Sequence, residues 1–179
     1  MGDDAAGPIS ADDRLFAPAG ARAVEVRLPS GLRYVLRSLC DQLETLLTTE
    51  DPSSDPALAR LSPAANTDDP LRELEFEQLA GDDLAAGRLA ALRELRDTAG
   101  AEVLEEEQAL AWLRTLNDLR LVLGTRLDVT EESGVEDFAG DEASSATFEL
   151  YGALGLIQGE LLLAIDPEAV EPEDVGPPA

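Results

Sequence analysis

The sequence contains no histidine, no lysine and only one cysteine, and aromatic residues make up only 4% of its 179 residues. Without an imidazole, the chain has no base for Ser–His–Asp or Cys–His catalysis, no histidine ligand for a catalytic zinc ion and no histidine pH switch. Cys40, being alone, has no partner for an intrachain disulfide. These absences favour a protein that is not an enzyme and predict no catalytic residues, no metal and no cofactor.

Basic residues are also scarce, since 13 arginines stand against 38 acidic residues for a formal net charge of −25. Such a surface repels polyanions, so we expect no binding to nucleic acid or to an anionic membrane. The simplest role of the acidity is solubility, and recognition of a basic protein partner is the alternative. No signal peptide is evident, and the longest apolar run, residues 152–165, is short for a membrane span and contains Glu160. The predicted location is therefore the cytoplasm.

Leucine, alanine and valine dominate the apolar residues, which favours helices packed on helices over an aromatic-rich β-sandwich. Apolar residues recur at helical spacing, and an Asp cap followed by Pro is typical of the start of a helix. The sequence predicts helices at about residues 30–47, 69–97, 105–126 and 144–165, with a break or kink in the second at 81–83 and a single turn near 55–61.

The predicted fold class is all-α, a compact bundle of four to five main helices in one domain, residues 14–165. Residues 22–28 alternate polar and apolar side chains, which is typical of one short strand or an extended arm lying on the helices. Residues 1–13 and 166–179 are acidic and contain Gly or Pro, so they are predicted to be disordered tails.

The first predicted helix has one apolar stripe, with Ser30 as its expected N-cap. Cys40 lies at the edge of the stripe and is interpreted as a small buried hydrophobe. The polar side chains predicted to face away from the stripe are Arg33, Arg37, Asp41 and Glu44.

Two acidic segments have the composition of cation sites but favour simpler interpretations. Glu105, Glu106 and Glu107 occupy the first turn of a helix, where carboxylates interact favourably with the helix dipole. Residues 128–142 are acidic, yet Ser133 and Ala139 stand where a calcium-binding EF-hand loop needs Gly and Glu. A solvated loop is the better interpretation of this segment.

Arg120 is the most informative residue, because it falls inside an apolar arc of the helix at 105–126, flanked by Asn117 and Gly124. A buried guanidinium needs a partner, since an unpaired charge is costly to desolvate. The favoured interpretation is a structural salt bridge to an Asp or Glu on a neighbouring helix. The alternatives are an anchor for an external carboxylate, phosphate or partner residue, or a side chain that reaches water along its methylene stem.

Three glycines, Gly152, Gly155 and Gly159, gather on one side of the last predicted helix. Glycine inside a helix costs about 1 kcal/mol relative to alanine, so this face is expected to support a close backbone approach. Packing within the chain is the favoured interpretation, and a homodimer contact is the alternative.

Several segments resemble an uncharacterised actinobacterial family, a domain of unknown function numbered two thousand seventeen. The resemblance covers most of residues 14–165 and rests on "LRSLCDQLETLL", "DPALARLSPAANTDDP", "FEQLAGDDLAAGRLAAL" and "AWLRTLNDLRLVLGTRLDVTEE". It implies a helical fold. It also implies genes that often neighbour the ClpS adaptor of Clp proteolysis and a JAB-type metallopeptidase. Some members carry a transcriptional-regulator label, which the charge of this chain argues against.

The sequence as a whole favours a non-enzymatic interaction or regulatory protein with a protein partner. The resemblance adds a link to Clp-type protein turnover. The first alternative is a small-anion-binding domain or enzyme with its site near Arg120, Asn117 and Gly124. The second alternative is a magnesium or calcium enzyme whose ligands are carboxylates only.

Overall fold

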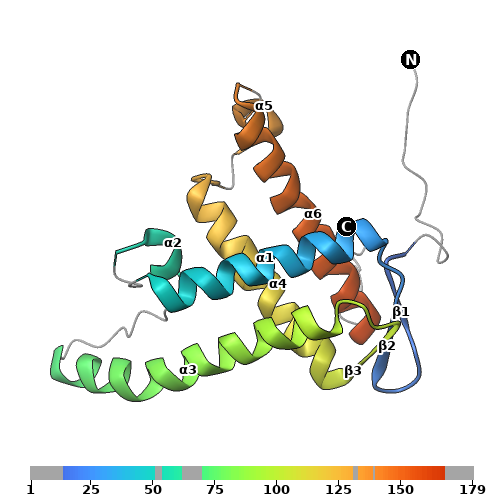
Figure 1. The fold of residues 1–179 in the computed structure, drawn as a ribbon, viewed down its shortest axis with the longest axis horizontal. Helices are drawn as coiled ribbons and strands as arrows, with labels where there is room; N and C mark the ends of the chain where they lie inside the picture. The colour runs from blue at the N-terminus through green and yellow to red at the C-terminus, as the bar shows by residue number, and fades with distance from the viewer. Residues whose placement is uncertain (1–13, 51–53, 62–69, 131–132, 139, 168–179) are drawn as a thin grey trace, which may run out of the picture.

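The computed structural model describes residues 14–50, 54–61, 70–130, 133–138 and 140–167, with side chains left out at 70–82 and at 135. Of the predicted disordered tails, 1–13 and 166–179, all but residues 166 and 167 lie outside the described residues. The described chain is mainly helical and carries a small antiparallel sheet (Figure 1).

The helices occupy most of the positions that periodicity predicts. They are α1 (Ser30–Thr49), α2 (Pro56–Ala59), α3 (Pro70–Thr98), α4 (Glu106–Arg126), α5 (Val135–Phe138) and α6 (Glu142–Ile165). Helix α3 runs through residues 81–83 without a break, contrary to the prediction, because one interior glycine costs only about 1 kcal/mol and α3 packs on α1 and α4 over its second half.

The predicted all-α class holds only in part, because the described residues are mainly helical but three short strands, where at most one was expected, form a sheet in the order β1-β2-β3. The strands are β1 (Phe16–Pro18), β2 (Ala23–Val26) and β3 (Val103–Glu105), and both pairings are antiparallel. Only β2 falls in the segment where a strand was expected. Three-residue strands are too short to show a two-residue period, and each needs a partner from elsewhere in the chain.

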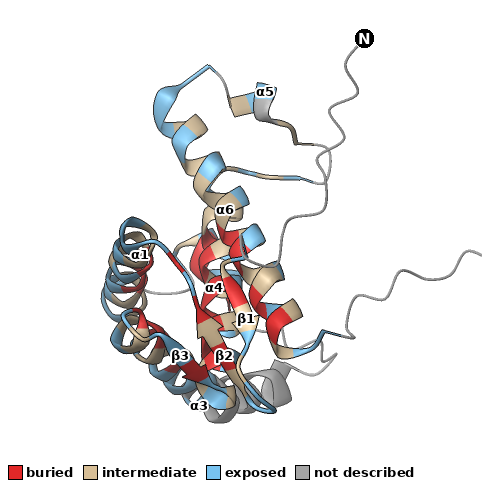
Figure 2. Cartoon of the chain, turned by 90° about the vertical axis from the view of Figure 1, so that its right-hand side faces the viewer, coloured by how far each residue is buried: buried red, intermediate tan, exposed pale blue. Residues whose placement is uncertain are grey.

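The core lies where the sheet meets α1, α3, α4 and α6, as the red residues in Figure 2 show. Trp112 of α4 is fully buried there, with its ring edge-on to Phe16 and its indole N–H donating to the Thr98 hydroxyl at 2.8 Å. Helix α5 and the first turns of α6 project from this centre and are mostly exposed or intermediate in burial (Figure 2). The molecule is therefore less compact than the predicted bundle.

The predicted N-cap of α1 is replaced by a neighbouring residue, because Pro29, without a side-chain bond, precedes the helix in place of the expected Ser30. Asp141 caps α6 by accepting from the Ser144 N–H. At α4, Glu105 and Gln108 form a reciprocal capping box, and Glu106 and Glu107 occupy the first turn, which fits the dipole interpretation of the acidic cluster.

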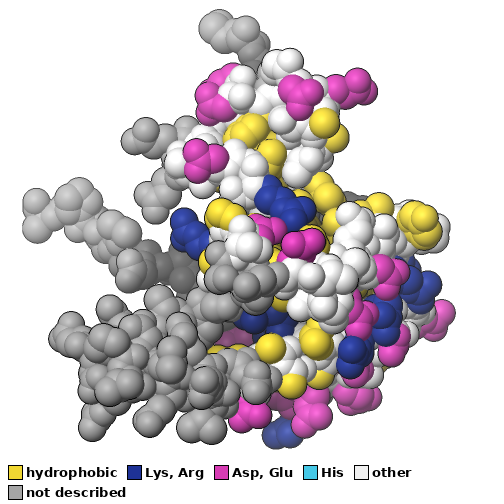
Figure 3. All heavy atoms as spheres, turned by 60° about the vertical axis from the view of Figure 1, so that its left-hand side comes forward, with side chains coloured by type: hydrophobic (Ala, Val, Ile, Leu, Met, Phe, Trp, Pro, Cys, Tyr) yellow, Lys and Arg dark blue, Asp and Glu magenta, His cyan; other side chains and the backbone are white. Residues whose placement is uncertain are grey.

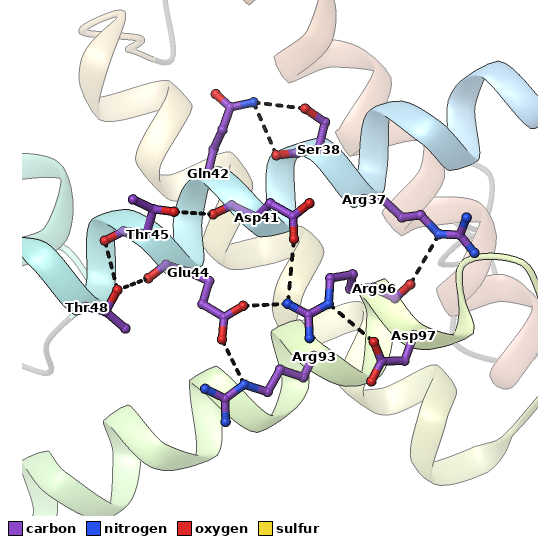
Figure 4. A network of polar contacts seen from close by, with 10 residues as sticks. All are labelled: Arg37, Ser38, Asp41, Gln42, Glu44, Thr45, Thr48, Arg93, Arg96 and Asp97. Carbon is purple, nitrogen blue, oxygen red and sulfur yellow. Dashed lines mark hydrogen bonds and ion pairs between the residues drawn. The ribbon is translucent and has the colours of Figure 1, made fainter.

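Ion pairs join α1 to α3 on the outside of the core (Figure 4). The Glu44 carboxylate accepts from Arg93 at 2.8 Å and from Arg96 at 2.6 Å. The hydrogen bond from Arg93 is the main reason that the pKa of Glu44 is lowered. Glu44 was predicted only to face away from the apolar stripe of α1, and the correction to that prediction is that long arginine side chains reach it from α3.

Arg33 is a second correction, because it was predicted to face away and instead points back at the backbone. Its guanidinium donates to the carbonyls of Val26, Leu28, Ala99 and Ala101 at 2.6–2.9 Å. One side chain thus joins the turn between β2 and α1 to the turn between α3 and β3.

Candidate functional site

Arg120 lies on the face of α4 that packs against α6, half-buried between the two helices. Its Nη1 donates to the Gln158 amide oxygen at 2.9 Å, and its Nη2 lies 3.4 Å from the Tyr151 hydroxyl. The guanidinium carbon is 5.1 Å from the centre of the Tyr151 ring, within the range of a cation–π contact. The Nε atom is buried and has no hydrogen-bond partner among the described residues.

The salt bridge favoured for Arg120 is wrong, because within the described residues no carboxylate oxygen lies within 4.0 Å of its guanidinium. The partners from α6 are an amide and a phenol, which are neutral. A partly buried ion pair does exist on α4, but its acidic member is Asp118, which accepts from Arg88 of α3 at 2.8 Å. Among the described residues, the guanidinium of Arg120 therefore contacts neutral partners and no carboxylate.

A pocket of about 240 Å³ opens beside Arg120, and it contains all three residues predicted for an interaction or anion site. Its lining is Arg60, Asn117, Arg120, Leu121, Gly124, Thr125, Asp128, Val129 and Tyr151. Gly124 leaves room for the Tyr151 ring, since a Cβ there would lie 3.2 Å from that ring. The pocket thus places two arginines, one carboxamide and one phenol around a small volume.

Sequence reasoning missed Arg60, Tyr151 and Gln158 as neighbours of Arg120. Tyr151, Gly155 and Gln158 recur at spacings of four and three, so they share one stripe of α6 beside the leucine stripe. That spacing is a signal that the sequence does carry. Arg60 has no such signal, because it reaches the pocket only through the placement of α2 against α4.

The glycines of α6 separate into two kinds. Gly155 faces α4, where a Cβ would lie 3.5 Å from the Arg120 guanidinium. Gly152 and Gly159 are exposed, and a Cβ at either would meet nothing within 4 Å. The interpretation of all three as an intramolecular packing face is therefore wrong for Gly152 and Gly159, while the homodimer alternative stays untested.

We expect opposite effects on stability from substitutions at these glycines. Gly152→Ala should raise the free energy of unfolding by roughly 0.5–1 kcal/mol, because alanine is the better helix former and has free space there. Gly155→Leu should lower it by about 1–3 kcal/mol, because the longer side chain collides with Arg120. Urea denaturation of both variants checks this pair, and equal effects would contradict the assignment of the two faces.

A second, larger hollow of about 970 Å³ lies between α3 and α4. Part of its lining is small or apolar, namely Gly87, Ala90, Ala91, Leu110 and Ala111. The charged residues of the lining are four glutamates, Glu94, Glu105, Glu106 and Glu107, against two arginines, Arg22 and Arg114. We refer to this hollow as the acidic groove.

The described residues contain no group of three or more Cys, Asp or Glu side chains placed to hold a metal ion. Cys40 is buried in the core, which confirms its interpretation as a small buried hydrophobe, and burial raises the pKa of its thiol to about 12. Compared with an ordinary thiol, this lowers the thiolate fraction at neutral pH by roughly a thousandfold.

Cys40 should therefore resist thiol reagents in the folded protein. At pH 8 the native chain should react with a chromogenic disulfide reagent at least about a hundredfold more slowly than the chain in denaturant. Rapid labelling of native Cys40 would contradict both the burial and the raised pKa.

Helix α6 is long and apolar enough to span a membrane by length and composition alone, which the short run at 152–165 had not suggested. A single helix of this kind is weak evidence for a membrane span. In the structure Leu154, Ile157, Leu161 and Ala164 of this helix are buried in the core.

Residues 13–165 match the model of a family described as a domain of unknown function (DUF2017), and the chain belongs to this family. Among curated proteins, it is 36% identical over 69 residues to the oxidative stress regulator AosR of Mycobacterium bovis and of two strains of Mycobacterium tuberculosis. The matched stretch is 38% of this chain and 31% of each relative, so most of the relatives' length has no counterpart in the match. No solved structure matches this chain.

Proposed function

We propose that this chain is a non-enzymatic regulatory protein that acts by binding a protein partner in the acidic groove. The similarity to proteins named oxidative stress regulators carries the regulatory part of the proposal. The groove supports the mode of action, because a lining that combines apolar side chains with an excess of glutamates suits a basic segment with one apolar face.

The charge of the molecule supports a protein partner rather than DNA. On the face drawn in Figure 3, basic side chains of the described residues lie between acidic ones instead of forming a continuous surface. The arginines that form ion pairs between described residues lie before α1, on α3 and on α4, namely Arg22, Arg27, Arg88, Arg93, Arg96 and Arg126, so these cations are already partnered. We expect no duplex DNA binding at physiological salt, and a sub-micromolar, sequence-specific gel shift would contradict this.

The relatives' name raises the question of redox sensing, and Cys40 is a poor candidate for that role. It is the only cysteine of this sequence, it is buried, and its thiol pKa is raised. If this chain regulates a response to oxidants, its signal must come from a partner or from another chemical group.

The groove is tested by affinity purification of the tagged full chain from native cells, read by quantitative mass spectrometry. Leu110→Arg places a cation in the lining of the acidic groove. As a control, Tyr34→Arg places the same charge outside the groove, at a side chain that is 73% exposed. We expect a partner that is retained by the wild type and by Tyr34→Arg but lost with Leu110→Arg, and whose binding weakens in higher salt.

A partner that binds Leu110→Arg as well as the wild type would exclude the groove. Recovery of no specific partner would contradict the interaction proposal itself. The finer link to Clp-type turnover rests on the resemblance alone and stays a prediction. The same purification tests it, because Clp components would then be enriched.

A further inference from the structure

The pocket beside Arg120 has donors that the fold leaves unused. Each terminal nitrogen of Arg120 carries two N–H groups, and the contacts to Gln158 and Tyr151 use one on each. The Tyr151 hydroxyl, as an acceptor toward Arg120, keeps its own hydrogen to donate. Arg60 makes no side-chain hydrogen bond or ion pair within the described part of the chain, and it lines the same pocket.

The two arginines of the pocket form a local excess of positive charge in a strongly acidic protein. The pocket lining holds Arg60 and Arg120 against one carboxylate, Asp128. Most other arginines on α3 and α4 are paired with acids, as Arg88, Arg93, Arg96 and Arg126 are. A half-buried guanidinium that is held by neutral groups, and that has no counter-ion among the described residues, is costly to maintain for stability alone.

We propose that this pocket binds a small oxyanion, a phosphate group or a short carboxylate, between Arg60 and Arg120. Planar guanidinium groups donate paired hydrogen bonds to such anions, and the Asn117 amide and Tyr151 hydroxyl complete the set of donors. Gln158 and the Tyr151 ring fix the orientation of Arg120, which reduces the entropy lost on binding. This site is separate from the acidic groove and does not depend on it.

The volume of the pocket limits the size of the ligand. At about 240 Å³, the pocket lies below the range of roughly 300–1,000 Å³ that is usual for drug-sized molecules. A free anion or the charged end of a larger compound fits this space. Asp128 adds a repulsive carboxylate to the wall, so its removal should strengthen the binding of any anion.

The test uses the full chain, with inorganic phosphate and sodium acetate as probes at pH 7 and constant ionic strength. Binding is followed by the thermal midpoint and by amide NMR shifts at Gly124 and Thr125, which line the pocket. We expect a saturable rise in midpoint with at least one probe, and the more effective probe identifies the anion type. Sodium chloride at the same ionic strength should give no saturable change.

Variants separate a binding site from a structural arginine. Arg60→Met and Arg120→Met should each weaken binding at least about tenfold. Because Arg60 is exposed, its replacement tests the site even if the Arg120→Met variant fails to fold. Asp128→Asn should bind several-fold more tightly, and asparagine tolerates the positive φ of 54° at this position. Arg114→Met, on the same helix but outside the pocket, is the control and should bind as the wild type does.

The proposal is overturned if neither probe gives saturable binding. It is also overturned if binding persists in Arg60→Met and Arg120→Met, or if it is lost equally in Arg114→Met. Because the acidic groove is lined by residues of the first half of α4 and shares no lining residue with this pocket, failure here leaves the proposed partner binding unaffected, and the purification with Leu110→Arg decides that separately.

Discussion

Replacement of Arg33 by methionine should destabilise the protein by about 3–5 kcal/mol, although the residue appears on the polar side of an amphipathic helix. Its guanidinium satisfies four backbone carbonyls, those of Val26, Leu28, Ala99 and Ala101. Hydrogen bonds to a charged group contribute roughly 1.5–3 kcal/mol each, and bonds from one group do not add fully. For a chain of this size the thermal midpoint should fall by roughly 10 °C.

Arg37, one turn further along α1, is the matched control for Arg33. It is exposed and makes one long contact, 3.3 Å, to the Arg96 carbonyl. Arg37→Met should change stability by less than about 0.5 kcal/mol. Arg33→Lys should recover only part of the loss, because one ammonium cannot replace the forked donors. Thermal and urea denaturation measure all three, and a loss below about 1 kcal/mol in Arg33→Met would disprove the role given to it.

Arg88→Met should cost about 3 kcal/mol at pH 7, because it strands Asp118 in a partly buried position. The two side chains are only 19% and 13% exposed, and Arg88 also donates to the Leu61 carbonyl at 2.6 Å. Removing one partner of a buried ion pair leaves a charge without compensation, which is the costly case. The double variant Arg88→Met with Asp118→Leu should recover much of the loss.

The effect of pH on this variant has a definite sign. Burial already raises the pKa of Asp118, and the nearby Arg88 opposes that rise. Without Arg88 the folded-state pKa rises further above the unfolded value, so the folded protein binds a proton more readily. The cost of Arg88→Met relative to the wild type should therefore shrink as pH falls from 7 toward about 4. Urea denaturation across this range measures the difference, and a cost that grows on acidification would contradict the assignment.

Much of the helical structure follows from local sequence alone. Apolar spacing places α1, α4 and α6 because each has an amphipathic pattern long enough to be recognised. Local rules also give the Asp55 cap with Pro56 at α2 and the acidic first turn of α4. The same local arguments place Arg120 toward a neighbouring helix, with Asn117 and Gly124 beside it.

Only the tertiary structure decides what those side chains meet. Strands β1 and β3 exist because β2 pairs with both, across more than 70 residues in the case of β3. Arg120 meets Gln158 and Tyr151, while the buried ion pair forms at Asp118, two residues earlier on α4. Periodicity determines which side of a helix is covered, but the identity of the covering residue depends on how distant helices pack. For that reason the sequence identifies Arg120 as unusual, and the packing of α2, α4 and α6 gives it a pocket and a second arginine.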